Sequence, residues 1–346
     1  MRNNVNVEGI LRHIEKRNKY GDERKDKKKK ETTLVTKIKI HNFFTKNEIN
    51  INNTLLLLEH KKNRYITIKK ATKLRINEVN NDNIQKTEIQ NENEYIMIKY
   101  DENEGEYIEG ITRFLYNKGE KEYIYGVIES YYYMMKTFFQ IQKEGIIYYN
   151  FSNEKMKFKD IYNPHCLLYD FEISLMERKM NTKDVKQSDI IKYFYNFITK
   201  TQDFTFKPFE VHVLFYLYKM EEQYLSKYKI MQIIDKYVDN MKNILKGQNE
   251  ELIKECCHQF MEKFINKNKE ETIIQLLKHY KTWDNYSVST LYLHLVENII
   301  QGYKTQIRFM SRFKDVLNQN LSPNPNQRMS IEDTINKFND LFQYWK

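Results

Sequence analysis

Glycine, proline and cysteine are scarce in this chain of 346 residues, which has 9 Gly, 4 Pro and 3 Cys. So few Gly and Pro exclude a collagen-like or low-complexity chain, and 40% hydrophobic residues are enough for a packed core. Three cysteines cannot build a disulfide framework. No apolar run approaches the length of a membrane span, and the chain does not begin like a signal peptide. We therefore expect a folded intracellular protein with reduced cysteines and no membrane segment.

Charge is mixed along most of the chain. The 57 basic and 47 acidic residues give a formal charge of +10, but they are interspersed, which is typical of a solvated surface. The exception is Arg24–Lys30, RKDKKKK, whose like charges repel one another and predict a disordered tail over residues 1–33. A nuclear-localisation patch or a nucleic-acid contact is the alternative use of this run. Nucleic acid is therefore one candidate partner, through the basic tail.

Residues 34–101 predict a small, strand-rich domain. The segments Val35–Ile40 and Tyr65–Ile68 alternate between apolar and polar residues, Leu55–Leu58 is a continuous apolar run, and Tyr95–Tyr100 reads YIMIKY. Each is short enough to be a strand.

Helical spacing dominates after residue 102. A long helix is predicted over Lys121–Lys143, where apolar residues form a stripe typical of core packing, and Gly145 follows it as a stop. Residues 220–280 predict a set of amphipathic helices inserted in this part of the chain. Further helices are predicted over Glu106–Tyr116, Ile190–Thr199, Val211–Lys219 and Thr290–Ile300.

Two short apolar runs in the middle of the chain, Ile146–Tyr149 and Cys166–Tyr169, predict a β-hairpin. A polar loop separates them, and each is followed by a polar residue, Asn150 after the first and Asp170 after the second. Such a hairpin would bring an amide and a carboxylate to the same edge. Polar groups presented by rigid strands often mark a functional site.

The order of these segments resembles the protein kinase family. The run IIYYN, a loop and then YDFE are similar to the kinase catalytic loop and its D-F-G turn. Further matches are Phe206–Glu210 with A-P-E, Trp283–Ser289 with D-x-W-S-x-G, and Ser322–Asp333 with the P-x-x-R-x-[ST] ending of kinase large lobes. The motifs look closest to the divergent Ser/Thr kinase-like proteins, or pseudokinases, of large double-stranded DNA viruses.

The resemblance implies an α+β, two-lobed kinase-like fold. It divides the chain into the tail (1–33), a reduced β-rich N-lobe (34–101) and a mainly helical C-lobe (102–346) that contains the insertion. In kinases the A-P-E glutamate pairs with the arginine of the last motif, and the matching residues here are Glu210 and Arg328. Asp284 matches the residue that tethers the catalytic loop from a buried helix. These three positions are expected to be structural.

The resemblance also locates the catalytic positions. Asn150 stands where kinases have the catalytic aspartate, and an amide is no base near neutral pH, so assistance typically worth about 10² to 10⁴ in rate is lost. Asp170 matches the magnesium-binding aspartate of D-F-G, with Glu172 in place of the glycine, where it would ligate a metal or crowd it. Asn153 is a possible replacement for a missing metal ligand. Lys155 is a possible phosphate contact.

The nucleotide-covering part of the family is hard to find in this chain. A Gly-rich loop cannot be built here because no glycine lies between Gly21 and Gly105. Lys69, in Ile66-Thr67-Ile68-Lys69, resembles the lysine of V-A-I-K, and an exposed strand lysine is the alternative. ATP and magnesium are therefore possible cofactors of a degraded site.

Three functional hypotheses follow. The first is a pseudokinase that acts as a scaffold or regulator by binding a protein partner. The second is a weakly active, atypical Ser/Thr kinase that uses Asp170 and Asn150 on a protein substrate. The third is a basic, helical nucleic-acid-binding protein, whose affinity would fall steeply with salt.

Overall fold

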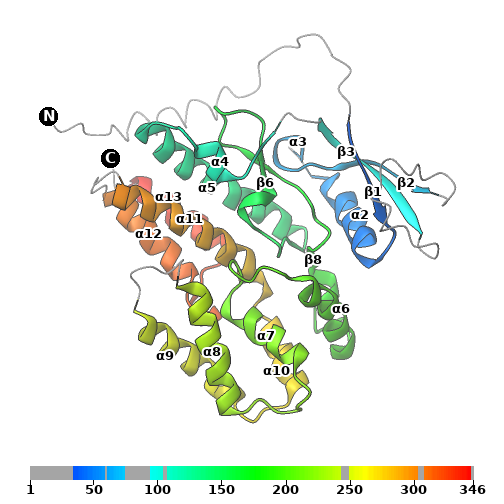
Figure 1. The fold of residues 1–346 in the computed structure, drawn as a ribbon, viewed down its shortest axis with the longest axis vertical. Helices are drawn as coiled ribbons and strands as arrows, with labels where there is room; N and C mark the ends of the chain where they lie inside the picture. The colour runs from blue at the N-terminus through cyan, green and yellow to red at the C-terminus, as the bar shows by residue number, and fades with distance from the viewer. Residues whose placement is uncertain are drawn as a thin grey trace, which may run out of the picture. The chain divides into compact units, whose positions relative to one another are not determined.

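The computed structural model shows an α+β chain that divides into two compact units (Figure 1). Among the described residues, unit 1 takes in 34–134 and Asn153–Glu172, and unit 2 takes in Met135–Ser152 and 173–343. The predicted basic tail lies outside the residues that the structure describes. These residues are 34–58, 61–74, 94–103, 107–242, 249–302 and 308–343.

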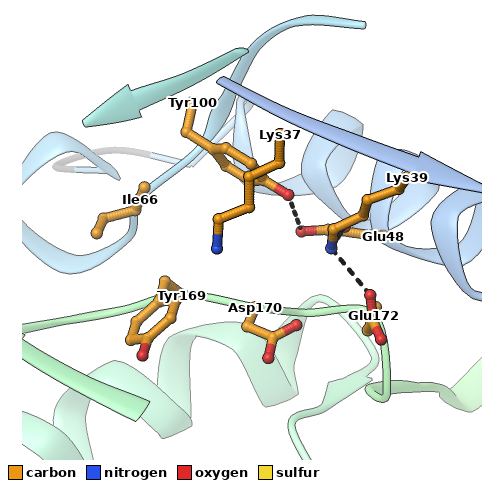
Figure 2. Close-up of a pocket in the computed structure, with 8 residues that line it drawn as sticks. All are labelled: Lys37, Lys39, Glu48, Ile66, Tyr100, Tyr169, Asp170 and Glu172. Carbon is orange, nitrogen blue, oxygen red and sulfur yellow. Dashed lines mark hydrogen bonds and ion pairs between the residues drawn. The ribbon is translucent and has the colours of Figure 1, made fainter. Parts of the chain in front are cut away.

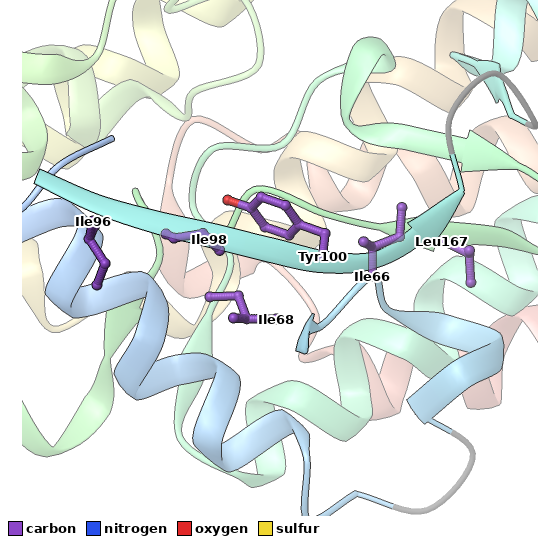
Figure 3. Close-up of a cluster of buried hydrophobic side chains, with 6 residues drawn as sticks. All are labelled: Ile66, Ile68, Ile96, Ile98, Tyr100 and Leu167. Carbon is purple, nitrogen blue, oxygen red and sulfur yellow. The ribbon is translucent and has the colours of Figure 1, made fainter. Parts of the chain in front are cut away.

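The sheet of unit 1 has three antiparallel strands, β1 (Leu34–Ile40), β2 (Ile68–Leu74) and β3 (Tyr95–Asn103), in the order β1-β3-β2. In the β1–β3 ladder Lys37 lies opposite Ile98 and Lys39 opposite Ile96. Because successive side chains alternate between faces, both lysines share the sheet face of these isoleucines. These isoleucines belong to a buried cluster, shown in Figure 3: Ile66, Ile68, Ile96, Ile98, Tyr100 and Leu167.

Helix α2 (Phe43–Leu55) corrects one prediction, because the apolar run Leu55–Leu58 is the end of this helix and the turn after it, not a strand. The N-cap residue Asn42 accepts hydrogen bonds from the backbone of Phe44 and Thr45, and the Thr45 side chain bonds back to Asn42. Reciprocal capping of this kind fixes the start of a helix. Four apolar residues are too few for periodicity to separate a strand from a helix end.

A second small sheet in unit 1 has the order β4 (Ile108–Glu109), β6 (Met156–Phe158), β7 (Cys166–Leu168). The helix predicted over Glu106–Tyr116 is only α4 (Ile111–Leu115), because part of its first half pairs with β6. The short helix α3 (Lys61–Arg64) contacts β7.

The predicted hairpin between the two central apolar runs is wrong. Strand β5 (Ile146–Ile147) pairs with β8 (Leu175–Met176) in unit 2, whereas β7 pairs with β6 in unit 1. The segment between the runs contains β6, which reaches β7 through a loop of only seven residues. A nearby antiparallel partner closes a shorter loop and therefore loses less chain entropy.

The helices make up most of unit 2, and α11 is buried along most of its length. The long predicted helix is α5 (Glu120–Lys143), which begins in unit 1 and ends in unit 2. The helices predicted over Ile190–Thr199, Val211–Lys219 and Thr290–Ile300 are confirmed as parts of α6, α7 and α11. Residues 220–280 contain α8, α9 and α10. The remaining bounds are α6 (Gln187–Lys200), α7 (Phe209–Lys219), α8 (Lys227–Met241), α9 (Glu250–Met261), α10 (Lys269–Leu277), α11 (Trp283–Gly302), α12 (Arg308–Asn320) and α13 (Ile331–Gln343). Among the described residues, no helix combines the length and apolar character needed to cross a membrane.

Candidate nucleotide site

A pocket in unit 1 gathers charged side chains from distant parts of the sequence (Figure 2). Its cavity volume is about 130 Å³. Strand β1 contributes two lysines, α2 a glutamate, β3 a tyrosine and the loop before β2 an isoleucine, and the segment after β7 contributes the other three residues. The lining residues are Lys37, Lys39, Glu48, Ile66, Tyr100, Tyr169, Asp170 and Glu172.

Lys39 lies at the centre of an ion-pair network in this pocket. Its Nζ is 2.9 Å from Glu48 Oε2 and 2.9 Å from Glu172 Oε2. Burial acts to lower the pKa of Lys39, but the nearby Glu48, Tyr100 and Glu172 outweigh it and raise this pKa above its ordinary value. Lys39 is therefore charged at neutral pH.

Glu48 is fixed by contacts on both of its carboxylate oxygens. Lys39 binds one oxygen, and the Tyr100 hydroxyl donates to the other at 3.0 Å. Burial raises the pKa of Glu48, while Lys39 and the Tyr100 hydrogen bond act in the opposite direction. Burial, followed by the charge of Glu48, also raises the pKa of Tyr100, so this hydroxyl stays protonated and remains a donor.

Asp170 has an unusual backbone and an unsatisfied oxygen. Its φ is 62°, in the left-handed region that few non-glycine residues adopt. One carboxylate oxygen contacts the Lys155 ammonium, but the other, Oδ1, is buried without a hydrogen-bond partner among the described residues. Strained backbone and an unpaired buried acceptor are features that cluster at functional sites.

The structure brings only some of the predicted site residues to this pocket. Lys155 contacts Asp170, but Lys69 is exposed on β2 and does not line the pocket. Asn153 accepts a hydrogen bond from the Thr112 backbone at 3.3 Å and donates to the Thr112 hydroxyl at 3.1 Å, so its amide is occupied at the start of α4.

Sequence reasoning missed Lys39 and Glu48. The alternation of Val35–Ile40 places Lys37 and Lys39 on one strand face, which is a signal that the sequence offers. The apolar run Leu55–Leu58 at the end of the Glu48 helix favours a strand, so the sequence pattern does not predict this helix. With that helix assigned, Lys39, and not Lys69, is the strand lysine that pairs with a helix glutamate.

The segment that leads to Asn150 lies in unit 2 and is held from α11. The Asp284 carboxylate accepts hydrogen bonds from the backbone of Tyr148 and Tyr149, each at 2.8 Å, and the buried Lys207 contacts the Tyr149 carbonyl. Burial raises the pKa of Asp284 to about 6, although both backbone bonds oppose it. Tyr149 has a φ of 60°. Tyr149, the residue before Asn150, therefore also has a strained backbone. Asp284 binds this segment, as the kinase resemblance predicts.

Glu210 and Arg328, which the kinase resemblance pairs, form a buried ion pair in unit 2. Arg328 donates from Nη1 to Glu210 Oε1 at 2.6 Å and from Nη2 to Oε2 at 2.8 Å. Both side chains are fully buried, and the Trp283 indole adds a third donor to Glu210 at 2.9 Å. Bidentate pairs of this kind have well-defined geometry and position the elements that carry them.

Comparisons with known proteins identify no family. No protein-family model matches the chain, and no curated protein matches it. Among solved structures, the twitchin kinase region from C. elegans matches with a TM-score of 0.41 and 12% identity, over 88% of this chain and 40% of that one. This chain therefore spans about two fifths of the twitchin region. A similarity this low carries no argument about fold or function.

Proposed function

We propose that the chain is a protein-kinase-like pseudokinase whose unit 1 keeps a degraded nucleotide-phosphate site, and that it acts mainly by binding a protein partner. The observation that carries this proposal is the ion pair between Lys39 and Glu48 in the same pocket as Asp170. In protein kinases a strand lysine pairs with a helix glutamate, and the D-F-G aspartate binds magnesium. Here the three residues occur in the same chain order.

The pocket residues suit the phosphate end of a nucleotide. Lys37 and Lys39 would face phosphate oxygens, and the unpaired Oδ1 of Asp170 would accept a magnesium ion. When bound, the ion would neutralise phosphate charge. The described residues contain no group of three or more His, Cys, Asp or Glu that could hold a metal by themselves, so the phosphates would have to supply ligands.

The size of the cavity limits what it can enclose. Sites for small organic ligands typically measure about 300 to 1,000 Å³, and this cavity is about 130 Å³. It therefore fits part of a nucleotide, in agreement with the lack of glycines for a covering loop. We expect weak binding.

Catalysis is weakened further by Asn150. Its amide cannot accept the substrate proton that a kinase aspartate accepts, so phosphoryl transfer is expected to be slow or absent. The second candidate is a slow Ser/Thr kinase, which is favoured by the ion pair of Lys39 with Glu48 and by the conformation of Asp170. Transfer of labelled phosphate from ATP to Ser/Thr peptides, abolished in Asp170→Ala, would establish the second candidate and exclude a pure pseudokinase.

Nucleotide binding is tested by thermal unfolding of the whole chain with ATP and Mg²⁺ or Mn²⁺. At about 100 times its Kd, a ligand stabilises the native state by roughly 2.7 kcal/mol. We expect the shift in Tm to be lost in Lys39→Met and in Asp170→Ala. The matched control is Lys69→Met, which removes the same charge from an exposed position in β2. A wild-type protein with no shift at millimolar ATP would contradict the nucleotide site.

The nucleic-acid hypothesis is tested separately. Deletion of residues 24–30 should abolish salt-dependent binding of a DNA or RNA duplex if the basic run carries it. Binding that survives the deletion, or that does not respond to salt, would contradict this use of the tail.

A further inference from the structure

We propose that Glu172 is an internal anion that masks Lys39 and thereby limits the affinity of the pocket for phosphate groups. This inference rests on the proposed nucleotide-phosphate site, and it assigns to the Glu172 carboxylate the role of lowering the phosphate affinity of that site. Glu172 stands where the kinase resemblance places the glycine of D-F-G, so its side chain is an addition to that pattern. Lys39 and Glu172 are 133 positions apart in the sequence and are 2.9 Å apart in space.

The two carboxylates on Lys39 are not equivalent. Glu48 has only 4% of its side chain exposed, and Tyr100 holds its second oxygen. Glu172 has 32% of its side chain exposed, and among the lining residues drawn in Figure 2 its ion pair is with Lys39. Glu172 already borders water and can rotate into it, whereas Glu48 would have to leave a buried position and lose its hydrogen bond from Tyr100. Glu172 is therefore the partner that an incoming anion would displace.

The backbone of Glu172 is held independently of its carboxylate. The Asn47 side chain, on α2, donates a hydrogen bond to the Glu172 carbonyl oxygen at 3.1 Å. Rotation of the side chain therefore does not require the chain segment to move. An exchange of Glu172 for a phosphate on Lys39 is a local rotamer change.

The pocket lining has three carboxylates and two lysines, and Lys155, which contacts Asp170 but is not a lining residue, balances the third negative charge. Glu48, Asp170 and Glu172 face Lys37, Lys39 and Lys155, and the raised pKa of Lys39 shows that its carboxylates stabilise the ammonium. A phosphate that enters adds negative charge, which the unmasked lysines must offset. Lys37 has no carboxylate partner among the described ion pairs and points into the pocket in Figure 2, so it is the first cation that an anion would meet.

The test compares Glu172→Gln with the wild-type chain by calorimetric titration of ATP with Mg²⁺ and of inorganic tripolyphosphate. We expect Glu172→Gln to bind both probes about two- to fivefold more tightly, the range for a partly exposed ion pair. Glu154→Gln is the control, because Glu154 is exposed in the same stretch and does not line the pocket. It should change affinity by less than about twofold. The double variant Glu172→Gln with Lys39→Met should lose the gain.

A second readout does not depend on nucleotide binding. Acetylation of Lys39 by an amine-directed reagent, followed by mass spectrometry, reports how well its ammonium is masked. The rate should rise about threefold or more in Glu172→Gln, because a lower pKa and greater access both favour reaction. It should not change in Glu154→Gln.

Calorimetric titration and Lys39 acetylation together distinguish a failure of the masking role from a failure of the proposed nucleotide site. Equal affinity of wild type and Glu172→Gln for both probes, where both are measurable, overturns the masking role and leaves the nucleotide site intact. Absence of binding in both proteins contradicts the nucleotide site. In that case a faster acetylation of Lys39 in Glu172→Gln still supports masking, and an unchanged rate overturns it.

Discussion

Replacement of Arg328 by methionine should be among the most destabilising single changes in unit 2. The substitution removes the two donors that bind the Glu210 carboxylate at 2.6 and 2.8 Å and leaves this fully buried charge with the Trp283 indole as its remaining hydrogen-bond donor. It also removes the donation from Arg328 Nε to the Ser322 carbonyl oxygen at 2.7 Å. A buried charge without its partner is the main source of the loss.

The magnitude follows from the burial of both side chains. Removal of one partner from a buried pair typically lowers the free energy of unfolding by about 3 to 5 kcal/mol, because the remaining charge stays desolvated. Simultaneous replacement of both residues removes the orphan charge. We therefore expect the double variant Glu210→Leu with Arg328→Met to lose less than the sum of the two single losses, with a coupling of about 2 kcal/mol or more.

Urea unfolding at pH 7, followed by far-UV circular dichroism, measures these free energies. The exposed ion pair of Lys242 with Asp239 supplies the control, because water screens this pair and Lys242→Met should leave the free energy of unfolding nearly unchanged. A loss below about 1 kcal/mol in Arg328→Met would refute the reasoning. The reasoning would also be refuted if the free-energy loss of the double variant equalled the sum of the losses of Glu210→Leu and Arg328→Met.

Two further predictions concern Asp284 and Asn42. Because burial raises the pKa of Asp284 to about 6 from 3.8, the folded state holds this proton more tightly than the unfolded state, so the carboxyl's contribution to stability should fall by roughly 2 to 3 kcal/mol between pH 4 and pH 7. The stability advantage of wild type over Asp284→Asn in urea should shrink accordingly as pH rises, and a difference that is constant with pH would contradict this. Asn42→Ala should lower the free energy of unfolding by about 1 kcal/mol through loss of the α2 cap. Asn42→Ser should restore most of it, and equal effects of the two substitutions in urea unfolding would count against capping.

Long helices with clear spacing were predictable from the sequence. The apolar stripe of Lys121–Lys143 and the stop at Gly145 predicted α5. At the start of α13 the Ser330 hydroxyl accepts a hydrogen bond from the Asp333 backbone at 3.0 Å, a cap that the spacing S-x-x-D favours. These signals depend on residues three or four positions apart, so a single sequence contains them. The kinase resemblance also implied the pair of Glu210 with Arg328, which the structure contains.

Strand pairing was not predictable in the same way. The sequence contains the short strands β5, β6, β7 and β8, but their pairing depends on which partners the folded chain brings together. The predicted hairpin paired β5 with β7, whereas each has another partner. Short apolar runs carry no information about partners, since many alternatives satisfy the same alternation.

The sequence by itself determined the long helices, and its order of segments resembles that of protein kinases. Only the tertiary structure decided which lysine pairs with which carboxylate. Lys39, Glu48 and Glu172 come from a strand, a helix and a distant loop, and they meet because sheet and helix packing bring their side chains within 3 Å. Such a contact stabilises charges through space, and no local pattern in the chain records it.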